Sequence, residues 1–201
     1  MNKKYISFDV EASGKTPGKY SMLSLGACIV GEREKIFYRE IKPISKNYIL
    51  EAMKIGSSGL HCLVDLKQLD EYNPKSKYFN PVKVLEVLDK KGNSPEEVMK
   101  DYADWIKENT KGFKPTEAAA PIKFDGMFTS YYFDNFYDGE NPFGHSGEDM
   151  NSFYRGVIKN LNANMKDLPR REKEDLSHNS LEDAIRQAKA FEEVLKMMKE
   201  I

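Results

Sequence analysis

Apolar and polar residues alternate with a period of two in the first part of the chain, which predicts β-strands before any helix. Residues 4–10 alternate and then run apolar, residues 22–30 (MLSLGACIV) are mostly apolar, and residues 35–41 form a third such stretch. The loop SGKTPGKY joins the first two stretches and has the glycine and proline content of an exposed turn. We therefore predict an antiparallel meander of three strands, with the second buried on both faces.

Apolar residues at spacings of three and four predict helices in the second half of the chain. The first helix should cover about residues 95–108, because a capping serine and a first-turn proline precede an apolar stripe there. The small side chains of residues 115–120 predict an interior strand, and the aromatic segment that opens at Asp125 predicts another helix. The last helix has the clearest pattern, with Asn179 and Ser180 as candidate capping residues.

Length and composition are typical of one soluble globular domain. The 201 residues are 40% hydrophobic and 31% charged, with a formal net charge of -1. We expect a single domain over residues 1–201, with a surface excursion at about 43–93, where the pattern weakens and we assign no function. The mixed-charge run DLPRREKEDL at 167–176 predicts a solvated loop.

The even balance of charge argues against a protein that grips long stretches of nucleic acid, because such proteins carry a basic excess. Any contact with nucleic acid should be short and local. The N-terminal segment has only a few apolar residues before Asp9, too few for the core of a signal peptide or for a membrane span. We therefore expect a cytoplasmic protein without a membrane partner. Cys28 and Cys62 show no CxxC spacing, and we expect both to be reduced.

Two acidic residues at the end of the first strand, Asp9 and Glu11, are the first candidates for chemistry. Their spacing of two places both side chains on one face of the strand, about 7 Å apart along the backbone. Acidic residues are disfavoured in strands and costly to bury, and a bound divalent cation is the commonest way to hold two carboxylates together. On the motif alone, two solvated acids at an exposed strand end explain the pattern equally well.

Three further candidates lie at the ends of later elements. Asp125 follows a short strand and begins a helix, where it could reach the edge of the sheet, although a simple helix cap is the better explanation for it alone. His178 lies just before the final helix and Asp183 one turn inside it. A metal ligand benefits from a rigid helix, whereas a general base tolerates a loop and must ionise near neutral pH. The alternatives are a surface histidine and a first-turn acid that faces the helix dipole.

In chain order these residues form three motifs, FDVEASG, FDGMF and HNSLED. The set resembles the DEDDh family of 3′-to-5′ exonucleases, which includes ribonuclease T, oligoribonuclease and the proofreading subunit of bacterial DNA polymerase III. The family's motifs are DxE after an apolar strand, an Asp after an aromatic or apolar residue, and a His followed by four residues and an Asp. The resemblance spans nearly the whole chain, but the second motif lacks the Asn or His that several members place before the aromatic residue.

The resemblance implies an α/β fold of the ribonuclease H-like class, a mixed five-stranded sheet flanked by helices, with the motif residues at one edge. It also implies that Asp9 bridges two Mg²⁺ or Mn²⁺ ions. Glu11 and Asp183 would hold the ion that binds the attacking water, and Asp125 would support the second ion. His178 would be the general base. Paired metals suit phosphodiester cleavage, which needs a deprotonated water, an in-line approach and charge stabilisation on the entering and leaving oxygens.

Members of the family wedge or stack the terminal bases with apolar side chains near the first two motifs. The matching positions here are Met22, Leu23, Phe124 and Phe128, although an aromatic stripe at helical spacing is more often packing than a base platform. We leave His61 as a surface or structural residue.

The function that the motifs favour is hydrolysis at the 3′ end of single-stranded or frayed nucleic acid, with release of nucleoside 5′-monophosphates. One alternative is a catalytically degenerate exonuclease fold that serves as a binding module. A second is a metal-dependent phosphatase with Asp9 as the nucleophile, which needs an Asp where Glu11 stands and leaves His178 without a role. The sequence leaves open whether the partner is RNA or DNA, since no motif encodes contacts to a 2′-hydroxyl. It also leaves the oligomeric state open, a homodimer included.

Overall fold

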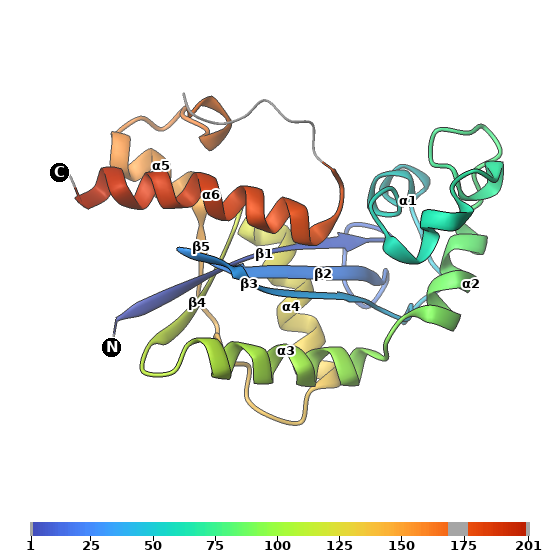
Figure 1. The fold of residues 1–201 in the computed structure, drawn as a ribbon, viewed down its shortest axis with the longest axis horizontal. Coiled ribbons are helices and arrows are strands. Elements are labelled where there is room, and N and C mark those ends of the chain that lie inside the picture. Colours follow the sequence, from blue (N-terminus) through green and yellow to red (C-terminus); the bar gives the residue numbers. More distant parts are fainter. Residues whose placement is uncertain (1, 169–176, 200–201) are drawn as a thin grey trace.

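A computed structural model describes residues 2–168 and 177–199, and a five-stranded sheet in the order β3-β2-β1-β4-β5 forms its centre (Figure 1). The strands are β1 (Lys3–Ala12), β2 (Met22–Ile29), β3 (Glu32–Glu40), β4 (Lys114–Ala119) and β5 (Gly147–Asp149). β1, β2 and β3 pair antiparallel, whereas β4 pairs parallel to β1 and β5 parallel to β4. The predicted meander and the predicted mixed five-stranded sheet are both confirmed. Of the charged run predicted to be a loop, residues 169–176 lie outside the described residues.

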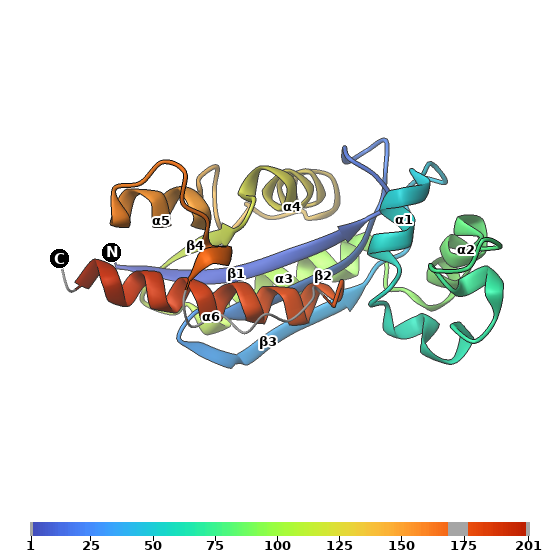
Figure 2. The ribbon, with the colours of Figure 1, turned by 90° about the horizontal axis from the view of Figure 1, so that it is seen from above.

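Helices cover both faces of this sheet. They are α1 (Leu50–Gly56), α2 (Pro81–Lys91), α3 (Pro95–Asn109), α4 (Ile122–Phe136), α5 (Met150–Ile158) and α6 (Ser180–Lys199), with the short 3₁₀ helices η1 (His61–Leu66), η2 (Asp70–Tyr72) and η3 (Met165–Asp167). α6 runs along one face, and α3 and α4 pack on the other (Figures 1 and 2). The Ser94 cap of α3 is present, since Ser94 Oγ accepts a hydrogen bond from Glu97 N–H at 3.2 Å.

The two faces of β1 have different neighbours. Ile6, Phe8 and Val10 lie in the core cluster that contains the apolar side chains of α3 and α4. Ser7 points the other way, because its Oγ donates to the carbonyl oxygen of Ala184 in α6 at 2.7 Å. The period of two therefore turns the odd-numbered acids of the strand toward the α6 side.

The start of α6 is held very close to the sheet. A Cβ atom on Gly26 of β2 would lie 2.2 Å from Leu181 N, so only glycine permits this approach. Asn179 caps the helix, as predicted, because its Oδ1 accepts hydrogen bonds from Leu181 N–H at 3.1 Å and Glu182 N–H at 3.2 Å. The other capping candidate, Ser180, instead bonds a serine of β2 through its hydroxyl. These contacts fix where the third motif lies relative to β1 and β2.

The segment at about 43–93 lies beyond one end of the sheet and contains α1, η1, η2 and α2 (Figures 1 and 2). Its apolar side chains form a cluster that also includes Leu23 of β2. The hydrophobic pattern is weak here because the helices are short and are interrupted by 3₁₀ turns, which break the helical period. Within residues 2–168 and 177–199, no helix combines the length and apolar character that a bilayer crossing requires.

Candidate active site

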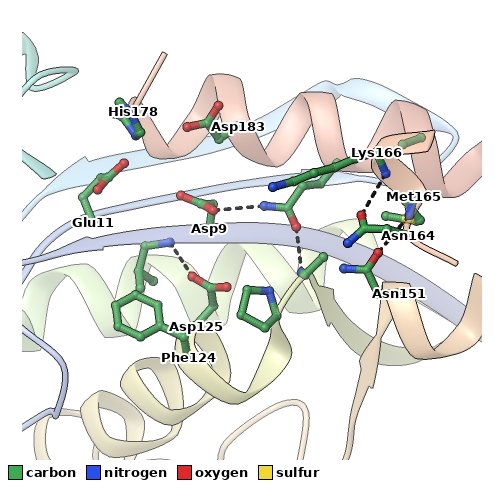
Figure 3. A pocket seen from close by; sticks show the side chains of 15 residues that line it. Asp9, Glu11, Phe124, Asp125, Asn151, Asn164, Met165, Lys166, His178 and Asp183 are labelled. Carbon is green, nitrogen blue, oxygen red and sulfur yellow. Dashed lines mark hydrogen bonds between the residues drawn. The ribbon is translucent and has the colours of Figure 1, made fainter. Parts of the chain in front are cut away.

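A pocket of about 330 Å³ opens at the edge of the sheet, between the end of β1, the start of α4 and α6 (Figure 3). The acidic residues and the histidine of the three motifs all line it: Asp9, Glu11, Asp125, His178 and Asp183. Phe124 also lines the pocket. Segments that are far apart in the sequence thus bring four carboxyl groups and one imidazole to the same small space.

Glu11, His178 and Asp183 form the tightest group in this pocket. Each offers one ligand atom, and these three atoms lie within 4.8 Å of one another. Ligand atoms about 2.0–2.4 Å from a divalent cation have this kind of separation, and carboxylate oxygens with an imidazole nitrogen suit Mg²⁺, Mn²⁺ or a similar ion. The donor set therefore fits a divalent metal, which the exonuclease motifs also imply.

Burial and mutual repulsion raise the pKa of the carboxyl groups in the pocket. Burial raises the pKa of Asp9 well above its usual value, and the neighbouring carboxylates raise it further. For Glu11, burial comes first among the causes of a strongly raised pKa, followed by the charges of Asp183 and Asp125. Burial raises the pKa of Asp125 to about 7. The pocket therefore concentrates negative charge that a divalent cation would neutralise.

The structure corrects the explanation of Asp125 as a helix cap. α4 begins at Ile122, three residues earlier, and the residue before it, Pro121, has no side chain that could cap the helix. Asp125 lies instead in the first turn, where it is only 3% exposed, and its Oδ1 accepts a hydrogen bond from Val10 N–H at 3.1 Å. This bond ties the second motif to the strand that carries the first, and it leaves the other carboxylate oxygen for the pocket.

Gln187, which the sequence reasoning missed, joins two walls of the pocket. Its Nε2 donates to Asp9 Oδ1 at 3.0 Å, and its Oε1 accepts from Ala120 N–H at 2.9 Å (Figure 3). The amide therefore fixes the orientation of Asp9 and leaves Asp9 Oδ2 unengaged by it. The only signal in the sequence is that Gln187 lies one helical turn after Asp183, on the same side of α6.

His178 is held by the segment to which the sequence analysis gave no function. The residue has a left-handed backbone with φ of 51°, and a Cβ atom on Gly59 would lie 2.1 Å from its carbonyl oxygen. The next residue, Asn179, donates from Nδ2 to Gly59 O at 2.8 Å and lies 3.2 Å from His61 Nε2. The backbone N–H of His61 donates to the carboxylate of Glu40 at the end of β3. His61 is therefore a structural residue of the site, which its isolated place in the sequence does not reveal.

Three of the four expected substrate-binding residues do not line the pocket. Met22, Leu23 and Phe128 are fully buried. Met22 and Phe128 belong to the cluster formed with α3 and α4, and Leu23 packs on the segment at 43–93. The physical reason is that β2 is buried on both faces and that Phe128 faces the sheet from α4. Only Phe124, which is partly buried, remains in a position to contact a ligand in the pocket.

A mixed sheet of this order, with four carboxylates and a histidine at its edge, defines the class of ribonuclease H-like nucleases with an acidic metal site. The chain is 36% identical over 154 residues to a protein of Escherichia coli named 3′-5′ DNA exonuclease Cap18, and the match covers 76% of this chain and 68% of that protein. The chain therefore belongs to the DEDDh family of 3′-to-5′ exonucleases. No protein-family model matches it.

Solved structures of E. coli exonuclease I share the fold. A zinc-bound complex with single-stranded DNA aligns with a TM-score of 0.59 at 14% identity and covers 100% of this chain and 41% of that one. A complex with a dT13 oligonucleotide gives a TM-score of 0.60 at 14% identity, over 99% of this chain and 42% of that one. At this identity the likeness establishes the fold alone. The chain spans about two fifths of the length of exonuclease I.

Proposed function

We propose that the chain is a metal-dependent 3′-to-5′ exonuclease that removes nucleoside 5′-monophosphates from the end of single-stranded DNA, with residues 1–201 acting as one exonuclease domain. The observation that carries the proposal is the convergence of four carboxylates and His178 on one pocket at the sheet edge. The related E. coli protein is named a DNA exonuclease, and exonuclease I was solved with bound single-stranded DNA. These similarities favour DNA over RNA as the substrate.

The four carboxylates of the pocket would hold two Mg²⁺ or Mn²⁺ ions between them. Glu11 and Asp183 would hold the ion nearer His178, in keeping with the group of ligand atoms within 4.8 Å that these three residues form. Asp125, whose other carboxylate oxygen is not engaged by Val10 N–H, would help to hold the second ion, and Asp9 would be a ligand of both. When bound, divalent cations lower the pKa of water and stabilise charge on the entering and leaving oxygens.

His178 serves as the general base in this scheme. A water loses a proton to the imidazole and attacks the terminal phosphodiester, the bond between phosphorus and the 3′ oxygen of the shortened strand breaks, and that oxygen takes up a proton. The position of His178 beside Glu11 and Asp183 puts the base next to the carboxylates that would hold the nearer ion. Arg186, which pairs with Asp183 at 3.0 Å, holds the orientation of that carboxylate.

A panel of 5′-labelled DNA and RNA oligonucleotides, incubated with Mg²⁺, Mn²⁺ or a chelator, tests the proposal. The labelled DNA should shorten one nucleotide at a time from the 3′ end, a 3′-phosphate should block the reaction, and the chelator should abolish it. Asp9→Ala and Asp183→Ala should be inactive but folded, because each removes a metal ligand and relieves repulsion among the remaining carboxylates. Full activity in excess chelator, or efficient cutting of a circular single strand, would contradict the proposal.

A further inference from the structure

One end of the pocket is lined by polar side chains that the catalytic scheme does not use. They are Asn151 near the start of α5, Asn164 just before η3, and Lys166 within η3. In Figure 3 these three residues lie on one side of Asp9, and Glu11 and His178 lie on the other. We call Asn151, Asn164 and Lys166 the donor wall. The sequence gives no hint of it, because its members belong to no motif and come together only in the fold.

Hydrogen bonds to the backbone determine which way the two amides of the donor wall face. Asn151 Oδ1 accepts from Met165 N–H at 3.0 Å, and Asn164 Oδ1 accepts from Lys166 N–H at 2.9 Å. Because both oxygens are engaged, the Nδ2 groups are the free ends of the amides. Within the part of the chain that the structure describes, neither Nδ2 has an acceptor. Two amide NH₂ groups are thus oriented and unused at one end of the pocket.

Lys166 adds a positive charge to these two donors. Its side chain is exposed and extends over the pocket in the direction of Asp9 (Figure 3). No acidic side chain among residues 2–168 and 177–199 forms an ion pair with it. An ammonium group offers three donors and no acceptor. The pocket therefore has carboxylates at one end and only donors, one of them cationic, at the other.

The ligand that matches the donor wall is an anion with several acceptor oxygens. The single-stranded DNA of the proposed function carries such an anion, a phosphate, at every linkage. The scissile phosphate belongs at the carboxylate end, beside the metal ligands. A volume of about 330 Å³ is near the lower end of pockets that hold small ligands, so the space between the two ends suits a group of about nucleotide size.

We propose that Asn151, Asn164 and Lys166 bind the phosphate next to the scissile one, on its 5′ side. The inference rests on the proposed exonuclease function. The donor wall would then help to align the DNA strand with the catalytic residues. The phosphate that it binds becomes the scissile phosphate after one nucleotide is released and the strand advances. The product, a single nucleotide, has no such phosphate and loses this contact.

The test uses a 5′-labelled thymidine oligonucleotide in which one linkage is an uncharged methylphosphonate. In one substrate it replaces the second linkage from the 3′ end, and in a matched control it replaces the sixth. Removal of the first nucleotide by the wild type should show a KM raised about tenfold for the first substrate, as expected when one charge-assisted contact is lost, and unchanged kcat and KM for the control.

Lys166→Ala should raise KM for the unmodified strand to a similar extent with little change in kcat, and should flatten the dependence of log KM on log salt by about 0.7. Asn164→Asp should also raise KM, because it keeps the acceptor for Lys166 N–H but replaces the donor with a negative charge. Lys90→Ala, an exposed lysine of α2 that does not line the pocket, should behave as wild type. In Lys166→Ala the methylphosphonate at the second linkage should have little further effect.

Independent, multiplicative effects of Lys166→Ala and of the methylphosphonate would overturn the inference, as would a wild-type KM that is insensitive to the second linkage. In both cases the unmodified strand is still shortened, so the proposed function survives. A wild type that fails to shorten the unmodified strand with Mg²⁺ or Mn²⁺ overturns both.

Discussion

At the scale of single residues, the geometry of His178 is compatible with two roles, metal ligand and general base. Its ring lies within 4.8 Å of ligand atoms of Glu11 and Asp183, which is close enough for an imidazole to coordinate the same cation. It also lies in a loop segment just before α6, where the proposed scheme needs a group that gains and sheds a proton. The two roles differ in what the loss of the imidazole would change.

If His178 is the base, His178→Ala should lower turnover by about 10² to 10⁴ and leave Mn²⁺ affinity nearly unchanged. Asp183→Ala should weaken Mn²⁺ binding first, since a carboxylate ligand is lost. Calorimetric titration of Mn²⁺ into the wild type and both variants separates these effects. The assignment fails if the histidine variant loses metal as badly as the aspartate variant, or if it keeps full turnover.

A second residue-scale effect comes from Glu117, a buried carboxyl group on β4 that the catalytic scheme does not use. It is 7% exposed, and Thr129 Oγ1 donates to it at 3.4 Å. Burial raises the pKa of Glu117 from 4.5 to about 7. Because the pKa is higher in the folded state, the folded protein holds this proton more tightly, and the associated stability is lost as the pH rises from about 4.5 to about 7.

Glu117→Gln should therefore increase the free energy of unfolding at pH 8, by at most roughly 3 kcal/mol, with little change near pH 4.5. Urea unfolding at several pH values, with a chelator present throughout, measures the difference. An equal effect of the substitution at both ends of this pH range would show that packing, not protonation, decides the stability of this position.

At the scale of secondary-structure elements, the segment at 43–93 positions the loop that carries His178. Asn179 performs two tasks at once: its Oδ1 caps α6, and its Nδ2 bonds Gly59 O at 2.8 Å. The backbone of Gly59 lies so close to His178 that a side chain there would collide with the carbonyl oxygen, 2.1 Å away. Because the colliding atom belongs to the backbone, it cannot move aside as the end of a flexible side chain could. The loop that carries His178 must therefore move if Gly59 is substituted.

Gly59→Ala should lower kcat about tenfold or more, because displacement of the base by about an ångström is enough to disturb its alignment. Mn²⁺ affinity should fall less than in Asp183→Ala. Gly156→Ala is the matched control, since a Cβ at Gly156 in α5 meets no atom within 4 Å and alanine favours a helix. Comparable kinetics for the two glycine variants would mean that the contact with Gly59 does not position His178.

At the scale of the whole molecule, the sequence predicts what depends on local pattern and misses what depends on distant contacts. The alternating pattern of β1, the apolar run of β2 and the Asn179 cap could be predicted, because each depends on neighbouring residues. The contacts of Gly59 and His61 with the loop that carries His178 could not be predicted, because this loop lies more than a hundred residues away in the sequence. Met22, Leu23 and Phe128 were predicted at the site because they flank the motifs, but their apolar side chains are used by the core. The position of a residue in a strand predicts which face of the sheet its side chain occupies. It does not predict whether helices or loops cover that face.

The metal should change the stability of the whole molecule in a way that depends on pH. Burial raises the pKa of Asp125 from 3.8 to about 7, and the pKa of Asp9 and Glu11 is also raised. Without metal, the folded state therefore loses stability as the pH rises, for Asp125 between about 4 and about 7, because these buried groups must ionise next to one another. A divalent cation binds only the ionised groups, and it binds the folded state in preference to the unfolded one.

Mn²⁺ should consequently raise the melting temperature more at pH 8 than at pH 6, since protons compete for the same carboxylates at the lower pH. At a free Mn²⁺ concentration of about 100 times its Kd, the expected stabilisation is about 2.7 kcal/mol. Differential scanning calorimetry at both pH values, with and without Mn²⁺, measures the two shifts, and Asp9→Ala should reduce both. Asp138→Ala, a change in an acid outside the pocket, should leave the shifts as in the wild type. If the shift is the same at pH 6 and pH 8, or absent at Mn²⁺ concentrations that support cleavage, the carboxylates of the pocket do not titrate together with metal binding.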